Sequence, residues 1–313
     1  MIDHLDIGFQ NWKKLGLVIN GSYTETYSYT SLPVALCIGE EVLRIYFSSR
    51  DPQNRSLPFF IDYSVKNKKV LFRSESPLLE LGEIGTFDDS GIMPTCLIKK
   101  SENEVWLYYI GWNLETTVPF RNSLGLAISN DGGSTFVKAY KGPIFDRTKN
   151  EPYFNASCSV FLEGSIYKMW YLSCVKWQKG DIPRHFYNIK YAESLNGIDW
   201  KRDGIVAIDF LYDNEYAISV PRVLKENGLY KMWYSYRGKE EIDTYRIGYA
   251  ESSNGLDWNR KDSQVGLDIS SAGWDSEMIC YPFVFDFENE RYMLYNGNGY
   301  GKTGFGIARL AGK

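Results

Sequence analysis

Acidic residues recur a short distance ahead of segments that read as β-strands. Three of them stand five or six residues before a proline: Asp89 before Pro94, Glu215 before Pro221 and Glu277 before Pro282. Glu151 occupies a related position, one place further out, ahead of the segment that contains Cys158. Carboxylates that share a site repel one another, so one of them keeps its proton near neutral pH and can act as a general acid while another acts as a base. These four residues are the candidate catalytic groups.

A repeated architecture can bring residues so far apart in sequence to one place, and the chain contains a repeat. The block YAESLNGIDW at 191–200 returns as YAESSNGLDW at 249–258, and the block YKMWY precedes each copy, at 167–171 and 230–234. The period is 58 residues, so a chain of 313 residues holds about five units. The sequence therefore predicts a closed array of similar units.

The composition indicates that these units are made of strands. Aromatic residues reach 16%, and they cluster in short alternating runs bounded by Gly, Asn, Asp and Ser, which is typical of β-structure. The fourth repeat reads as strands over 219–225, 229–236 and 245–251, with another that begins at 258, and two Asn-Gly turns separate them. We expect an all-β protein made of four-stranded antiparallel units.

The expected fold is a single five-bladed β-propeller domain over residues 1–313. Residues 12–19 parallel the outer segment that begins at Trp200, so we expect the N-terminal strand to complete the last blade and close the ring. The predicted boundaries are 1–20 for the outer strand of blade 5, 21–75 for blade 1, 76–145 for blade 2, 146–208 for blade 3, 209–268 for blade 4 and 269–313 for the rest of blade 5.

The blade motifs carry a resemblance to a known superfamily. Strands that open with Pro-Val, a Tyr-x-Met-Trp-Tyr strand, and a Tyr-Ala-x-Ser segment leading into a Ser-x-x-Gly-x-x-Trp turn resemble the five-bladed glycosidases. That superfamily includes arabinanases and xylosidases, invertases and levansucrases, and mannoside phosphorylases, and the resemblance covers essentially the whole chain. It implies an acid and a base that face the central channel from different blades, and hence a glycoside hydrolase or phosphorylase acting on a small glycoside or sugar conjugate.

One position departs from that pattern. Where the arabinanase-like sequences have an aspartate directly before the proline of blade 1, this chain has Leu32 before Pro33. Leucine cannot act as a base, so three interpretations stay open: a carboxylate from another blade takes over, an external nucleophile such as phosphate reacts, or the pocket binds without cleaving. The last makes the chain a non-catalytic carbohydrate-binding or accessory protein of surface-polysaccharide metabolism.

The loops after the second strand of each blade should return to the face where the first strands begin. They are rich in aromatic rings, amides and guanidinium groups, which stack on sugar rings and bind their hydroxyls. With His185 on a neighbouring loop and Arg222 after Pro221, the predicted substrate-binding residues are Arg50, Asp51, Trp112, Asn113, Trp177, His185, Arg222, Arg237 and Asn298. The alternatives are that Trp112 and Trp177 pack between blades and that His185 lies on an exposed loop.

Charge and composition exclude some classes of binding partner. A net charge of -4 argues against a nucleic-acid ligand, and no apolar run is long enough to insert in a membrane. The N-terminus lacks the form of a signal peptide, so we expect a cytoplasmic protein. Five cysteines without C-x-x-C spacing predict no metal site, and we expect no cofactor, although some relatives hold calcium in the channel. The sugar, its linkage and the oligomeric state are left open.

Overall fold

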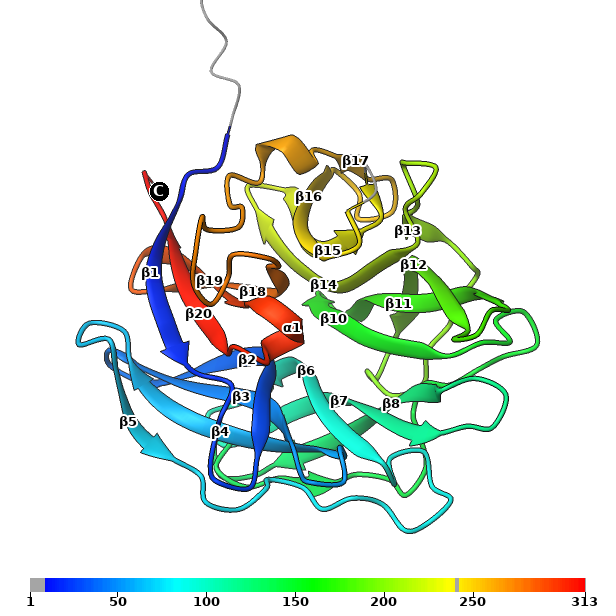
Figure 1. Ribbon diagram of the computed structural model, residues 1–313, viewed down its shortest axis with the longest axis horizontal. Helices are drawn as coiled ribbons and strands as arrows, with labels where there is room; N and C mark the ends of the chain where they lie inside the picture. Colours follow the sequence, from blue (N-terminus) through cyan, green and yellow to red (C-terminus); the bar gives the residue numbers. More distant parts are fainter. Residues whose placement is uncertain (1–8, 240–241, 313) are drawn as a thin grey trace, which may run out of the picture.

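The computed structural model describes residues 9–239 and 242–312 and confirms the expected all-β class (Figure 1). Successive strands pair antiparallel in groups of four. Group 1 contains β2 (Ser28–Gly39), β3 (Val42–Arg50), β4 (Ser56–Ser64) and β5 (Lys69–Arg73). Group 2 contains β6 (Gly91–Lys99), β7 (Val105–Leu114), β8 (Phe120–Ser129) and β9 (Val137–Lys138).

The remaining groups repeat this order. Group 3 contains β10 (Asn155–Glu163), β11 (Ile166–Gln178), β12 (Arg184–Ser194) and β13 (Val206–Ile208), and group 4 contains β14 (Ala217–Glu226), β15 (Leu229–Arg237), β16 (Arg246–Ser252) and β17 (Asn259–Arg260). Group 5 contains β18 (Cys280–Phe287), β19 (Glu290–Asn296) and β20 (Phe305–Leu310), with β1 (Trp12–Ile19) paired to β20. Short helical turns of the described chain include η2 (Asp262–Gln264) and α1 (Asn298–Gly301). In the part of the chain that the structure describes, no helix has the length and apolarity to cross a membrane.

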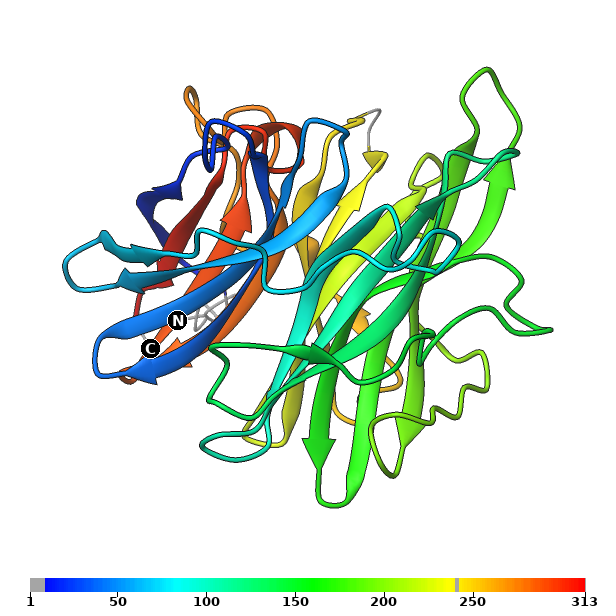
Figure 2. The ribbon, with the colours of Figure 1, turned by 90° about the horizontal axis from the view of Figure 1, so that it is seen from below.

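The first strand of each group lies nearest the centre of Figure 1. β2 contacts β6, β6 contacts β10, β10 contacts β14, β14 contacts β18, and β18 contacts β2. The side view shows most hairpin turns toward the upper and lower sides of the molecule, while some long connections between groups run across it (Figure 2). The starts of all the first strands therefore share one face, where side chains from different groups can meet.

The outermost strands are shorter than the sequence suggested. β9 and β17 have two residues each, and Trp200 lies in a turn ahead of β13 and does not begin a strand. Short outer strands leave few unpaired backbone groups, which limits edge-to-edge association.

The glycine turns of groups 2, 3 and 4 each bind the preceding group. The hydroxyl of Tyr108 donates to the carbonyl of Gly197 at 2.9 Å, and Trp170 Nε1 donates to the carbonyl of Gly255 at 2.8 Å. Tyr46 makes the same contact with Gly133 at 2.7 Å. The donor lies on the second strand of one group and the acceptor in the last hairpin turn of the next. This contact explains why the strand block and the turn block recur together.

β1 is held in group 5 by buried aromatic packing as well as by its pairing. Trp12 is 6% exposed, and its ring lies edge-on to Trp233 of group 4, with centroids 6.4 Å apart. Both indole N–H groups donate to Oε1 of Gln10 at 2.9 Å. The N-terminal strand therefore joins group 5 to group 4.

Replacing Trp12 with alanine should lower the free energy of unfolding by about 3–5 kcal/mol, because it leaves a large cavity between two groups. Urea unfolding followed by circular dichroism measures this. Lys13→Ala, at an exposed position on the same strand, is the control and should change stability by less than about 0.5 kcal/mol. Equal effects of the two variants would contradict the proposed packing role of β1.

Candidate functional site

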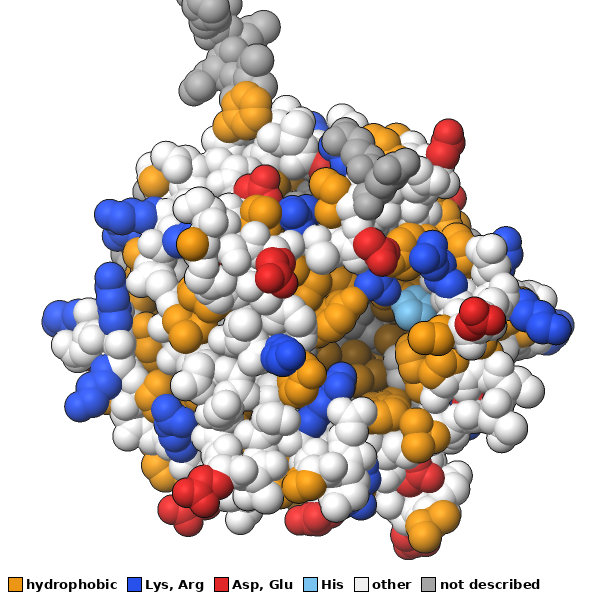
Figure 3. Space-filling view, viewed as in Figure 1, with side chains coloured by type: hydrophobic (Ala, Val, Ile, Leu, Met, Phe, Trp, Pro, Cys, Tyr) orange, Lys and Arg blue, Asp and Glu red, His pale blue; other side chains and the backbone are white. Residues whose placement is uncertain are grey.

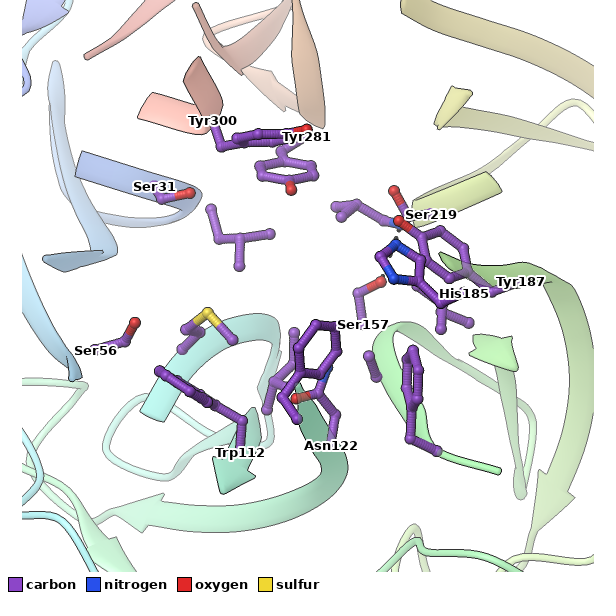
Figure 4. Close-up of a pocket in the computed structure, with 18 of the residues that line it drawn as sticks. Ser31, Ser56, Trp112, Asn122, Ser157, His185, Tyr187, Ser219, Tyr281 and Tyr300 are labelled. Atoms are coloured by element: carbon purple, nitrogen blue, oxygen red, sulfur yellow. Dashed lines mark hydrogen bonds between the residues drawn. The ribbon is translucent and has the colours of Figure 1, made fainter. Parts of the chain in front are cut away.

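A cavity of about 470 Å³ opens where the first strands begin, and its lining comes from groups 1 to 5. This volume lies within the usual range of small-molecule sites. The space-filling view shows a hollow lined by hydrophobic side chains with a histidine at its edge (Figure 3). The close-up shows side chains from separate groups around an open centre (Figure 4).

The floor of the cavity is built by residues in an unusual backbone conformation. Leu32, Val220 and Tyr281 each precede a strand proline, and their φ angles are 56°, 48° and 57°. Bulky and β-branched residues rarely adopt positive φ, and such strain is found where a site needs it. The pairing of each first strand is interrupted by a bulge at this level. The bulges turn these side chains toward the centre.

Each strained residue is held by a side chain from the preceding group. The N–H of Leu32 donates to Oδ1 of Asn296 at 2.9 Å, and the N–H of Tyr281 donates to Oγ of Ser235 at 2.7 Å. The N–H of Val220 donates to Oγ of Ser157 at 2.9 Å. The floor is therefore fixed by contacts between groups.

The walls combine aromatic faces with short polar side chains. Aromatic rings on the lining come from Trp112, Phe120, Phe154, Tyr187, Tyr245, Tyr281 and Tyr300, and small polar groups come from Ser31, Ser56, Asn122, Ser157 and Ser219. Tyr281 and Tyr300 stack, with centroids 6.4 Å apart and an interplanar angle of 28°. The cavity thus offers flat apolar surfaces beside hydroxyl and amide groups.

No aspartate or glutamate belongs to this lining in the described parts of the chain. Its charged side chains are Arg50 and Arg237. Calcium takes oxygen ligands that usually include carboxylates, so the lining does not fit such an ion. No group of three histidine, cysteine or acidic side chains with metal-binding geometry occurs among residues 9–239 and 242–312.

His185 lies against the same cavity and is neutral at physiological pH. Burial, followed by the positive charges of Arg237 and Arg184, lowers the pKa of His185 to about 4. Its ring stacks on Tyr187 at 4.9 Å and meets Trp177 edge-on at 5.3 Å. A neutral imidazole can accept or donate a hydrogen bond to a ligand. The alternative of an exposed loop histidine does not hold, because His185 lies in β12 and is partly buried.

Two of the candidate catalytic acids are buried in ion pairs away from the cavity. Glu215 is 3% exposed and accepts from both terminal nitrogens of Arg260 at 2.8 Å. Glu151 is 5% exposed, pairs with Lys190 and Arg202 at 3.0 Å, and accepts from the hydroxyl of Tyr171 at 2.9 Å. Their oxygens are occupied by fixed donors within groups 3 and 4.

The same arrangement recurs in groups 2 and 5 with neighbouring acids. Asp88 accepts from the hydroxyl of Tyr109 at 3.1 Å and pairs with Lys138 at 2.7 Å. Asp275 accepts from the hydroxyl of Tyr295 at 3.0 Å and pairs with Lys14 at 2.7 Å. We call this unit the carboxylate clamp: a buried acid at the opening of a group, with a second-strand tyrosine and a cation from an outer strand or the segment beside it.

The clamp has a second acid in group 4 and lacks its tyrosine in group 1. In group 4, the tyrosine hydroxyl of Tyr234 bonds to Asp262, and Arg260 joins Asp262 to Glu215. In group 1, Phe47 replaces the tyrosine and packs edge-on against Tyr23, with centroids 5.0 Å apart. The position without a hydroxyl thus has aromatic packing in place of the clamp.

Asp89 and Glu277, the other candidate acids, also lie outside the cavity lining. Asp89 accepts from the N–H of Gly85 at 2.9 Å and from the hydroxyl of Ser90 at 2.7 Å, so it organises its own loop. Glu277 is exposed. The structure therefore does not bring Asp89, Glu151, Glu215 and Glu277 together at the axis. In groups 2 and 5 the buried acids of the clamp are Asp88 and Asp275, one and two residues from the candidates Asp89 and Glu277, and a catalytic role for any of the four candidates stays a prediction.

Four predicted substrate-binding residues line the cavity: Arg50, Trp112, His185 and Arg237. Trp177 packs behind the lining, against His185, Phe120 and Phe154. The other four have different partners.

Those four residues stabilise loops and strands. Asp51 accepts from Arg55 Nε at 2.8 Å, and Asn113 lies opposite Arg121 in the β7–β8 pair. Asn298 Oδ1 accepts the N–H of Glu277 at 2.8 Å. Arg222 donates to the carbonyl of Val284 at 2.7 Å, below the floor. The structure does not place these side chains on the cavity lining.

The comparisons with known proteins give a family and a fold. No protein-family model matches the sequence. The uncharacterized protein Rv1502 of Mycobacterium tuberculosis (strain ATCC 25618 / H37Rv) is 38% identical over 305 residues, which cover 96% of this chain and 99% of Rv1502. This protein belongs to the same family as Rv1502. A 1,2-beta-oligomannan phosphorylase of Thermoanaerobacter sp. (strain X514) is 34% identical over 79 residues, 25% of this chain and 27% of the phosphorylase.

Comparison with solved structures shows which fold this member of the Rv1502 family adopts. A glycosyl hydrolase from Bacteroides ovatus has a TM-score of 0.71 at 14% identity, with 96% of this chain and 93% of the hydrolase covered. A structure from the GH130 family of mannoside phosphorylases has a TM-score of 0.65 at 15% identity, with 97% and 94% covered. A thermostable family-43 glycoside hydrolase has a TM-score of 0.63 at 18% identity, with 93% and 90% covered. The fold is that of the propeller-type glycoside hydrolases.

The carboxylate clamp predicts that replacing Glu215 lowers stability much more than replacing Glu277, although the sequence pattern suggested the same role for both acids. Glu215→Gln removes one of the two carboxylates that bind Arg260 and leaves the pairing with Asp262, so it should lower the free energy of unfolding by about 1–3 kcal/mol through the loss of buried charge-assisted hydrogen bonds. Urea unfolding measures this effect.

Glu277→Gln is the matched control, because it makes the same chemical change at an exposed site, and it should shift stability by less than about 0.5 kcal/mol. A Glu215→Gln protein as stable as the parent would contradict a structural role for that carboxylate.

Proposed function

We propose that the protein binds a carbohydrate or sugar conjugate in the central cavity, without hydrolysis by a carboxylate pair. In this proposal the groups are the blades of a closed five-bladed propeller, and Arg50, Trp112, His185 and Arg237 contact the ligand. The observation that carries it is the lining, which combines several aromatic faces with serine hydroxyls and an asparagine amide in about 470 Å³.

The lining supports a sugar ligand on chemical grounds. The C–H face of a sugar ring packs on flat aromatic side chains, and its hydroxyls require donors and acceptors in fixed positions. Trp112 and the stacked pair Tyr281 and Tyr300 provide such faces on different groups, with Ser31 and Asn122 between them around the cavity (Figure 4). The names of several proteins of similar fold refer to glycoside hydrolases, and one refers to mannoside phosphorylases.

The position of the acids supports binding over hydrolysis. Glycoside hydrolysis usually uses two carboxyl groups that flank the scissile bond, about 5 to 9.5 Å apart depending on the stereochemical outcome. The cavity lining described here contains no carboxyl group, and the buried acids of the clamps are paired with lysine or arginine. A sugar in this cavity would meet tyrosine, serine and a neutral histidine.

A binding screen tests the proposal. Neutral and acidic monosaccharides, and the aryl glycosides of common sugars, are titrated into the protein while its tryptophan fluorescence and heat release are followed. We expect saturable binding of at least one sugar, weakened about tenfold or more by Trp112→Ala, because that change removes a stacking face. Tyr140→Ala, at an exposed tyrosine outside the cavity, should bind like the parent.

The same titrations are followed for product release, with and without phosphate. The proposal predicts no turnover of any aryl glycoside. Release of free sugar, or of a sugar phosphate when phosphate is present, would replace it with hydrolysis or phosphorolysis. Absence of binding by every sugar would contradict it altogether.

A further inference from the structure

Arg237 differs from the other well-packed arginines of this protein. Arg260 pairs with Glu215 and Asp262, Arg202 pairs with Glu151, and Arg44 pairs with Asp62. Arg237 forms no ion pair with a carboxylate anywhere in residues 9–239 and 242–312. It is partly buried at the end of β15 and belongs to the cavity lining. Its positive charge is therefore uncompensated within the described protein.

The neighbours of Arg237 fix its guanidinium without neutralising it. Nη1 lies 2.6 Å from the hydroxyl of Tyr300, and Nη2 lies 3.4 Å from Nε2 of His185. The rings of Tyr216 and Tyr245 lie 4.8 and 4.7 Å from the guanidinium carbon. Nε of Arg237 is buried and has no hydrogen-bond partner. The aromatic rings and the Tyr300 hydroxyl orient the guanidinium. Nη1 and Nη2 each carry two N–H groups and each makes one of the contacts above, so each terminal nitrogen has a second N–H for a ligand.

The rest of the cavity is also positive or neutral. Arg50 lines the opposite side from group 1, where Nη1 donates to Oδ1 of Asn54 at 2.9 Å and its guanidinium lies 4.7 Å from the Tyr29 ring, again without an ion pair among the described residues. His185 faces Arg237 and Arg184 and packs on Tyr187, Trp177, Phe120 and Phe154, none of which is acidic. Burial of an unpaired guanidinium is costly unless an anion completes the site.

We propose that the ligand of this cavity is an acidic sugar, a uronate or a sugar phosphate, whose anionic group is bound by Arg237. This inference rests on the proposed sugar-binding function and specifies its ligand class. The planar guanidinium donates two parallel hydrogen bonds to a carboxylate or phosphate, which neutral sugars cannot match. The sugar ring then lies against Tyr300 and Tyr281, because Tyr300 contacts both Arg237 and the Tyr281 ring.

Matched pairs of probes test the inference by calorimetry. Glucose, galactose and mannose are each compared with the corresponding uronate and 6-phosphate, and inorganic phosphate is titrated alone. We expect at least one acidic member to bind about tenfold or more tightly than its neutral partner and than phosphate. Arg237→Gln should abolish that difference, while Arg147→Gln, at an exposed arginine outside the cavity, should preserve it.

The possible outcomes separate this inference from the proposed function. Neutral and acidic partners of equal affinity would overturn the acidic-sugar inference and leave sugar binding intact. Phosphate alone binding as tightly as any sugar phosphate would also overturn it, because the site would then recognise an anion without a sugar. No binding by any sugar would overturn the proposed function itself.

A measurement on the unmodified protein covers the case in which Arg237→Gln does not fold. Raising the salt to about 0.5 M NaCl screens charge interactions, so affinity for the acidic sugar should fall severalfold while affinity for its neutral partner stays unchanged. Arg237→Lys, which keeps the charge and loses the planar fork, should bind the acidic sugar with intermediate affinity. Salt-independent binding of the acidic sugar would contradict the role of Arg237.

Discussion

The carboxylate clamp is the interaction on which the arrangement of the strand groups most depends. In groups 2, 3 and 5, a buried acid at the start of the group binds a tyrosine of the second strand and a cation from the outer part of the same group. Burial, reinforced by the nearby carboxylate, raises the pKa of Tyr109, Tyr171 and Tyr295, so these hydroxyls stay protonated and donate. Each clamp thus ties the innermost loop to the edge of its group, and removal of the acid leaves the tyrosine hydroxyl and the cation without their shared partner.

The clamp also affects which side chains line the cavity. The buried acids that precede the first strands are held in ion pairs within their groups. The residues directly before the strand prolines, which line the cavity, are Leu32, Met93, Val220 and Tyr281. Among the described residues the lining holds no carboxylate, and its charged side chains are Arg50 and Arg237. The cavity is therefore positive and aromatic, and the proposed sugar binding rests on this feature.

Sequence patterns predicted the repeated parts of this protein well and its site poorly, for a physical reason. The strand and turn blocks recur because a second-strand aromatic must bond the glycine turn of the next group, so their spacing fixes the all-β class and the order of strands. Which acid of a loop turns inward depends on bulges and loop conformation. Asp88 forms the clamp and adjacent Asp89 does not, a difference that periodicity cannot resolve. From the loop after β19 the sequence predicted Asn298 as a binding residue, whereas Tyr300 lines the cavity, because the backbone of this loop turns through positive φ at Tyr300 (62°).

We propose that a sugar binds in the cavity, whose lining has no acid among the described residues, and that the predicted catalytic acids stabilise the fold. A crystal structure of the protein with a bound acidic sugar tests this most directly. We expect density for the sugar against Trp112 and Tyr281, with its anionic group on Arg237 and no oxygen of Asp89, Glu151, Glu215 or Glu277 within hydrogen-bond distance. A sugar bound with its anomeric carbon between two of those carboxylates would show that hydrolytic acids act in this cavity after all.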